Sequence, residues 1–153
     1  MEQVYIAPNA TVVGDVELHR DVNIWYGAVL RGDCGKITVG EGTNIQDNAV
    51  VHDETTIGKN CTVGHSAIIH GCTVGDDCLI GMGAIVLSGA VLEDGCLVGA
   101  GALVTGKTHA PAGSILLGSP AKAVKTVTPE QLEETRKNAQ HYIELGRKAF
   151  GNK

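Results

Sequence analysis

A period of six residues runs through most of the chain, and it constrains the fold more than any other feature. From position 12 to position 104, every sixth residue is Val, Ile or Leu, apart from two shifts of register. The first shift is a three-residue insertion between Leu30 and Val39, and the second is a one-residue deletion between Ile69 and Val74. The column residues are Val12, Leu18, Ile24, Leu30, Val39, Ile45, Val51, Ile57, Val63, Ile69, Val74, Ile80, Val86, Leu92, Val98 and Val104.

A hexapeptide period of this kind is the signature of a β-helix, in which each unit is a short strand with a turn and three units close one coil. Positions 18 residues apart therefore stack, with strands about 4.8 Å apart. Small or β-branched residues stand two places before the column residues, and we expect the four cysteines in that slot to be buried: Cys61, Cys72, Cys78 and Cys96. Glycines often follow the column, where we expect backbone angles that other residues rarely adopt: Gly40, Gly58, Gly64, Gly75, Gly81 and Gly99.

The period ends before residue 128, and a helical pattern replaces it. Thr128 is placed as the N-cap, Pro129 as the first helical residue and Gln131 as the partner in a capping box. An apolar stripe follows, so we expect this helix to pack along the prism: Leu132, Ala139, Tyr142, Ile143 and Phe150. The sequence thus predicts a β-helix domain over residues 1–127 and a packed helix over residues 128–153.

Composition excludes several classes of function. The formal net charge is −5 with no basic stripe, which argues against nucleic acid and membrane surfaces as partners. No apolar run reaches the length of a membrane span, and the first ten residues do not resemble a secretory signal. The cysteine count is five, and none forms a CxxC pair, so we expect reduced thiols and a cytoplasmic protein.

Three histidines are placed where a metal site can form. His52 and His70 each follow a column residue and lie 18 residues apart, so their side chains should stack on one edge, with Arg31 one coil below them. His65 falls on another face, and only a neighbouring copy packed around a threefold axis can bring it to this pair. Three histidines with an open fourth position are typical of catalytic zinc.

Other polar residues divide into neighbours of this site and bystanders. Gln46 and Asp47 lie one coil below His65, where they would orient a ligand or a water molecule. The competing interpretation is that these are ordinary solvated turn residues, and we expect that for His19, His109 and His141.

The segments RGDCGKITVGEGTNIQDNAVVHD and VGHSAIIHGCTVGDDCLIGMGAIVLSGAVL resemble the gamma-class carbonic anhydrases and their relatives in the hexapeptide-repeat superfamily. The resemblance covers nearly the whole chain, and its specific part is the ordered set RGD, NIQDN, VVH and GHxxxxHG. It implies a left-handed β-helix, a homotrimer, and a metal held by His52, His70 and the neighbour's His65. The metal would be Zn²⁺, with Fe²⁺ or Co²⁺ as alternatives, because imidazole suits all three.

The resemblance also implies roles for the remaining residues. Arg31 and Asp33 match an interface ion pair, Gln46 the residue that orients a metal-bound hydroxide, Asp47 its acidic neighbour, and Tyr142 a tyrosine from the terminal helix. The implied reaction is reversible hydration of CO2 to bicarbonate by that hydroxide. The sequence departs from the pattern at Cys34, where some members carry a glutamate that moves protons.

Two other functions suit the same fold. A hexapeptide acyltransferase, or a related thioesterase-like hydrolase, would use His65 or His70 as a base, although an acyltransferase does not explain why two histidines stack one coil apart. A non-catalytic, metal-loaded trimeric scaffold would keep the metal site and have no need of Gln46.

Overall fold

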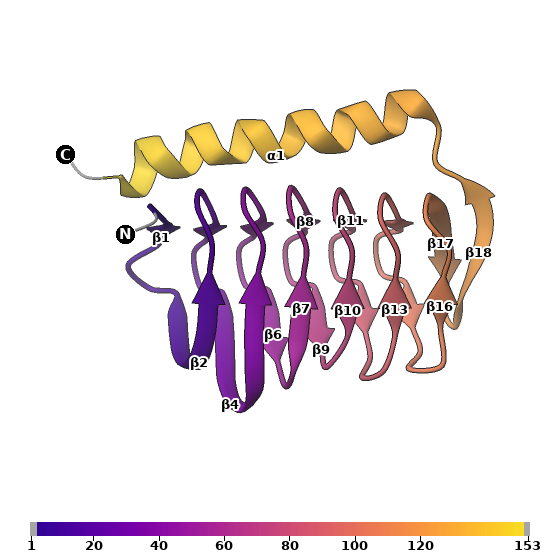
Figure 1. The fold of residues 1–153 in the computed structure, drawn as a ribbon, viewed down its shortest axis with the longest axis horizontal. Coiled ribbons are helices and arrows are strands. Elements are labelled where there is room, and N and C mark those ends of the chain that lie inside the picture. The colour runs from indigo at the N-terminus through magenta and orange to yellow at the C-terminus, as the bar shows by residue number, and fades with distance from the viewer. Residues whose placement is uncertain (1–2, 152–153) are drawn as a thin grey trace.

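The computed structural model describes residues 3–151 and consists of stacked coils of short parallel strands with one helix along their side (Figure 1). One face of the stack is a sheet of eight strands: β1 (Tyr5–Ile6), β3 (Asn23–Ile24), β5 (Asn44–Ile45), β8 (Thr62–Val63), β11 (Leu79–Ile80), β14 (Leu97–Val98), β17 (Ser114–Gly118) and β18 (Ala121–Thr126). The predicted parallel β-helix followed by one helix is confirmed.

The other two faces form a single sheet, because long strands cross the corner between them. The first half of β4 pairs with β6 and its second half pairs with β7. The members are β2 (Thr11–Leu18), β4 (Val29–Val39), β6 (Val50–His52), β7 (Thr55–Ile57), β9 (Ile68–His70), β10 (Thr73–Val74), β12 (Ile85–Val86), β13 (Val91–Leu92), β15 (Leu103–Val104) and β16 (His109–Ala110).

The strand register follows the hexapeptide period, including its two shifts. Val51 pairs with Ile69, a step of 18 residues, whereas Leu30 pairs with Val51 across the insertion. The side chains of the column residues fill the prism, and all of them from Ile24 onward are at most 2% exposed. Val12 and Leu18, in the first coil, are partly buried against this core. The four cysteines predicted to point inward are buried.

The prediction of unusual backbone angles at the glycines after the column was wrong. Gly58 does not have a positive φ; it is required because a Cβ there would lie 2.7 Å from the backbone of Gly75 in the next coil. The left-handed conformation occurs three residues after the column, at Asn60 (φ 55°) and at Gly42 (φ 76°) one coil earlier. Coil stacking therefore excludes the side chain at one position, and turn geometry selects Gly or Asn at another.

Helix α1 (Pro129–Phe150) begins with the predicted capping box: Thr128 accepts from the Gln131 backbone N–H, and the Gln131 side chain accepts from the Thr128 backbone. The helix then runs back along the first sheet toward β1 (Figure 1). Its most buried residues include Thr135 and Gly146, which the apolar stripe did not identify. Gly146 permits close packing, since a Cβ there would lie 2.9 Å from the Asn23 side chain.

The end of the β-helix contains one element that the period does not predict. β17 and β18 pair antiparallel, with the GSPAK segment at the turn between them. The division into domains at residues 127 and 128 stays a prediction, and residues 1, 2, 152 and 153 lie outside the described part of the chain. Within that part, no helix combines the length and the hydropathy needed to span a bilayer.

Candidate metal centre

His52 and His70 form a ladder across two neighbouring strands. β6 and β9 pair in parallel with His52 opposite His70, and Arg31 on β4 stands opposite His52 one coil below. The ring centroids lie 5.1 Å apart, and His52 Nδ1 is 3.3 Å from His70 Nε2. The predicted stacking on one edge is confirmed, and the two rings turn one nitrogen each toward the other.

Partners on both sides decide which nitrogens remain available. An ionised carboxylate only accepts hydrogen bonds, so His52 donates from Nε2 to Asp33 Oδ1 at 3.2 Å. The neutral His52 ring therefore presents a lone pair at Nδ1, facing His70. On the far side, His70 Nδ1 lies 2.8 Å from the Ser88 hydroxyl, which can donate or accept. Two arrangements follow. In one, His70 donates a proton from Nε2 to His52 Nδ1. In the other, His70 donates from Nδ1 to Ser88, and the lone pairs of His52 Nδ1 and His70 Nε2 both face one point between the rings.

Asp33 is held by charge as well as by hydrogen bonds. Arg31 donates from Nη1 to Asp33 Oδ2 at 2.9 Å, which leaves Oδ1 for His52. Partial desolvation pushes the pKa of the Asp33 carboxyl up, but the hydrogen bonds from Arg31 and His52 outweigh it and hold the pKa below its ordinary value. Arg31, Asp33, His52 and His70 thus form one connected group, which we call the His52 edge.

His65 lies elsewhere, on the turn that follows β8. Its side chain is 43% exposed, and its Nδ1 is 3.0 Å from the Asp47 carboxylate on the stacked turn one coil earlier. Gln46, next to Asp47, is 5% exposed and donates from its amide nitrogen to Asn44 at 3.0 Å. This bond uses one of the two amide N–H groups and fixes the orientation of the amide, so that the carbonyl oxygen and one N–H remain to contact a ligand.

Helix α1 completes the surroundings of His65. Tyr142 lines a cavity of about 260 Å³ together with Gln46 and His65, and Asn138, one helical turn earlier, lines it too. The Tyr142 ring packs edge-on against Trp25, with centroids 5.5 Å apart. Burial and then the charge of Asp47 raise the pKa of the Tyr142 phenol, which keeps it protonated. We call Gln46, Asp47, His65 and Tyr142 the His65 edge.

The predicted site residues therefore fall into two groups within one chain. The His52 edge belongs to the ten-stranded sheet, whereas Gln46, Asp47 and His65 follow strands of the other sheet. Among residues 3–151, the ligand atoms of His65 join no cluster of three candidate metal ligands. His19 and His109 lie outside both groups, near Glu17 and Glu93, and His141 lies beside Tyr142 on the helix.

The residues of the His52 edge fit a divalent metal ion. Two nitrogens each bound at 2.0–2.1 Å to a tetrahedral zinc ion are about 3.3 Å apart, and His52 Nδ1 and His70 Nε2 show that 3.3 Å separation. Asp33 and Ser88 supply the outer hydrogen bonds that ligating histidines usually make. The donor set consists of imidazoles, which suits zinc, iron and cobalt.

Sequence reasoning missed four residues that support these groups. Thr62 pairs with Asn44, 18 residues earlier, so the stacking rule had already placed it. Ser88 lies one place past the position that stacks on His70, because the one-residue deletion shortens this coil to a step of 17 residues. Thr62 Oγ1 accepts from Asn44 at 2.9 Å and from Asn138 at 3.0 Å, which ties the helix to the Gln46 network. No signal in the sequence placed Asn138, because its contact depends on how α1 docks.

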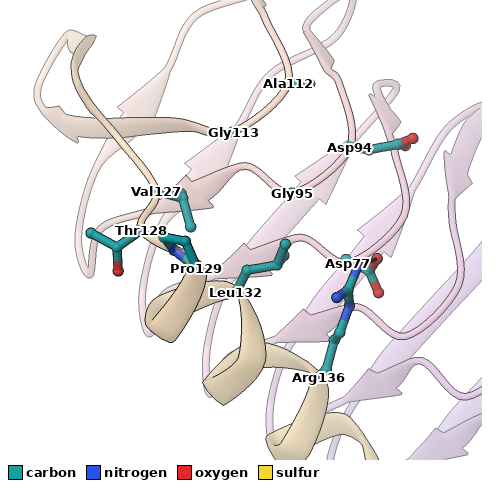
Figure 2. Close-up of a pocket in the computed structure, with 10 residues that line it drawn as sticks. All are labelled: Asp77, Asp94, Gly95, Ala112, Gly113, Val127, Thr128, Pro129, Leu132 and Arg136. Atoms are coloured by element: carbon teal, nitrogen blue, oxygen red, sulfur yellow. Dashed lines mark hydrogen bonds and ion pairs between the residues drawn. The ribbon is translucent and has the colours of Figure 1, made fainter.

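A larger cavity lies away from both edges. It measures about 510 Å³ and separates the first turns of α1 from the last coils, where Arg136 pairs with Asp77 at 3.2 Å (Figure 2). Val127, just before the helix, and Leu132 in its first turn both line it (Figure 2). It contains no histidine and none of the predicted site residues, so size alone does not identify the site.

Comparisons with known proteins identify the family to which the chain belongs. A family model described as bacterial transferase hexapeptide (six repeats) matches residues 36–71 and 71–106. A protein of Methanocaldococcus jannaschii named probable carbonic anhydrase is 45% identical over 148 residues, which cover 94% of this chain and 93% of that protein. The chain belongs to the gamma carbonic anhydrase family.

Two further proteins are similar to this chain, one in sequence and one in sequence and structure. Gamma carbonic anhydrase 2, mitochondrial, of Arabidopsis thaliana is 47% identical over 94% of this chain, and the chain spans only 55% of that relative's length. A crystal structure of a hexapeptide transferase family protein from Anaplasma phagocytophilum superposes with a TM-score of 0.92 at 48% identity, covering 95% of this chain and 88% of that one.

Proposed function

We propose that the protein is a gamma-type carbonic anhydrase whose site forms between two protomers of a homotrimer. His52 and His70 of one protomer and His65 of the next would hold one metal ion. The observation that carries this proposal is the split between the two edges: the His52 edge offers two converging nitrogens, and the third histidine of the same chain joins no ligand cluster. Three copies around a threefold axis would complete three equivalent sites.

The metal would be Zn²⁺, with Fe²⁺ or Co²⁺ as the alternatives. Such an ion, when bound, lowers the pKa of a coordinated water toward 7 and so supplies a nucleophile at neutral pH. Among the chain's own residues, Asp33 fixes the tautomer of His52, and Ser88 would accept the Nδ1 proton of His70 so that the lone pair on His70 Nε2 faces the metal. Asp47 holds the His65 ring at 3.0 Å.

The substrate would be CO2 and the product bicarbonate. The bond to Asn44 orients the Gln46 amide, and its carbonyl oxygen would accept a hydrogen bond from the attacking oxygen and align it. Tyr142 and Asn138 would wall the cavity on the helix side. Arg31 places a positive charge beside the pair of histidines, which favours an anionic product.

A hexapeptide acyltransferase, or a thioesterase-like hydrolase on the same scaffold, is the second candidate, favoured by the similarity to the hexapeptide transferase family protein of Anaplasma phagocytophilum. It requires a histidine base and no metal. A metal-loaded trimer without catalysis is the third. The metal content of the purified protein distinguishes the acyltransferase or hydrolase from our proposal. Stopped-flow CO2 hydration with each of the three metals distinguishes the non-catalytic trimer from it.

The deciding experiment combines two variants of the chain in one assembly. His52→Ala and His65→Ala variants each lack one proposed ligand, and each alone should bind metal more than about 100-fold more weakly than the parent protein. When the two are co-expressed with different tags and the mixed assemblies are purified, a His52→Ala chain can still donate His65 to the intact pair of a His65→Ala chain. We expect part of the metal and of the CO2 hydration to return. If the mixture stays as empty as the single variants, the shared site is wrong.

The cellular location is also part of the proposal. All five cysteines are free thiols, which fits a reducing compartment such as the cytoplasm. Fractionation of cells that express the untagged chain would test this location.

A further inference from the structure

The prism has three corners, and the proposed reaction uses two of them. His65 lies on a turn that leaves the eight-stranded sheet, between β8 and β9, and His52 ends β6, where the chain turns toward β7. The turns that contain Asp77, Gly95 and Gly113 enter the eight-stranded sheet at the third corner. These three turns line the cavity of about 510 Å³ (Figure 2). A trimer that joins the first two corners would leave this cavity open.

Most of the cavity wall is apolar. Val127, Pro129 and Leu132 contribute side chains from the start of α1, and the opposite wall is largely backbone, at Gly95 and Gly113 (Figure 2). The N–H groups of both glycines are already bonded to carbonyls of the preceding coil. The volume of about 510 Å³ falls in the range of small-molecule sites. This part of the cavity therefore suits an aliphatic group.

One end of the cavity carries a guanidinium with unused hydrogen-bonding capacity. Arg136 lies one helical turn after Leu132, so the two side chains share one face of α1. Among residues 3–151, the Arg136 side chain makes a single hydrogen bond, from Nη2 to Asp77 Oδ2 at 3.2 Å. A guanidinium has five N–H donors in a planar fork, so four of them remain. Two of these can bind one carboxylate side by side, which is the geometry that arginine favours.

We propose that this cavity binds a small aliphatic carboxylate, with its chain against Val127 and Leu132 and its carboxylate on Arg136. Asp77 limits the charge of the ligand, because it already balances Arg136 and would repel the second negative charge of a phosphate. Asp94 also lines the cavity, but its Oδ1 accepts a backbone N–H at 2.7 Å, and its side chain extends away from the start of α1 (Figure 2). An alcohol of the same length would gain the apolar contacts alone.

The experiment titrates the full chain with butanoate, hexanoate and octanoate, and with hexan-1-ol as an uncharged probe. Amide chemical shifts of isotope-labelled protein locate the binding, and isothermal calorimetry measures the affinity. We expect one carboxylate per protomer, with shifts at Gly95, Gly113 and Val127. Affinity should rise about fourfold for each added methylene that the cavity buries. Hexanol should bind about tenfold more weakly than hexanoate, because it lacks the hydrogen bonds to a charged group.

Two substitutions at the charge pair should act in opposite directions. Arg136→Gln removes the guanidinium and should weaken hexanoate binding about tenfold, while hexanol binds as before. Asp77→Asn removes the carboxylate that competes for Arg136 and should tighten hexanoate binding about threefold. Asparagine also tolerates the positive φ of 57° at this position. If the pair only held the helix in place, both variants would lose affinity instead.

Lys137→Gln serves as the matched control, because Lys137 is exposed, directly follows Arg136 and does not line the cavity. It should bind hexanoate like the parent protein. Parallel losses in Arg136→Gln and Asp77→Asn, equal affinities for hexanoate and hexanol, shifts confined to other parts of the chain, or no saturable binding would each overturn the proposal. A failed CO2 hydration assay would leave these results untouched, since neither readout depends on a metal or on catalysis.

Discussion

The two edges of the prism carry the same kind of residue and use it in different ways. On the His52 edge, two histidines face each other at 3.3 Å and are braced from outside by Asp33 and Ser88. On the His65 edge, a single histidine stands beside Asp47, next to a cavity that Gln46 and Tyr142 line. We propose that the first edge holds a cation and that the second receives and orients small molecules. Neither is a complete site, which is why we place the reaction where two protomers meet.

The strongest test of this comparison removes a ligand from each edge in turn. His52→Ala and His65→Ala should each reduce metal affinity by more than about 100-fold, beyond the 10–100-fold typical of outer partners. The losses should be similar, because each variant removes one ligand from every shared site. Metal per protomer, measured by mass spectrometry after dialysis, checks this. A His65→Ala protein that retained its metal would confine the ion to the His52 edge.

A smaller effect should follow when only the bracing of the His52 edge is removed. Ser88→Ala takes away the hydroxyl at 2.8 Å from His70 Nδ1, and we expect metal affinity to fall by about 10–100-fold. Competition with a metal-binding dye measures the change. Ser88→Thr keeps a hydroxyl and should restore most of the affinity, whereas equal losses in both variants would mean that packing, not the hydrogen bond, is what matters.

On the His65 edge, a substitution should slow catalysis without reducing metal binding. Gln46→Ala removes the carbonyl oxygen but no proposed ligand, so metal content should stay the same while CO2 hydration falls about tenfold, the effect of one hydrogen bond of about 1.4 kcal/mol. Stopped-flow kinetics on metal-matched samples measures this. Unchanged kinetics with unchanged metal would remove Gln46 from the mechanism.

The smallest expected effect is electrostatic. The pKa of Tyr142 is raised first by burial and then by the charge of Asp47, so Asp47→Asn should move this pKa back toward its ordinary value without reaching it. Tyrosinate absorbance followed through alkaline pH measures the shift, and Tyr142→Phe identifies the contribution of Tyr142. An unmoved titration would show that burial alone sets the value.

Much of this molecule follows from its period. The six-residue spacing predicts the coils, the buried column and the stacking of Arg31, His52 and His70, because strand pairing converts a sequence distance of 18 into a spatial neighbour. The same rule explains why Cys61 is buried and Cys34, inside the insertion, is not. Backbone hydrogen bonds between coils fix the position of each residue along the stack, so this position can be predicted from the six-residue spacing.

Side-chain partners were harder to predict. The period and its one-residue deletion place Leu87, not Ser88, above His70. The Ser88 hydroxyl reaches the ring nitrogen from the next position along, through two side-chain rotamers that the spacing does not determine. Asn138 reaches Thr62 across 76 residues of chain because of how a whole helix docks. The glycines after the column were misread for a related reason: their role is set by the backbone of the next coil and not by their own turn.

The return path of α1 makes an open-ended stack behave as a closed unit. Repeat proteins whose units touch only their neighbours can fray from either end. Here the helix that leaves the last coil lies against the first (Figure 1). Arg147 donates to the Tyr5 hydroxyl at 3.3 Å, and Gly146 packs on Asn23. Loosening one end must therefore detach the other, and the chain should melt in a single cooperative transition like a small globular domain.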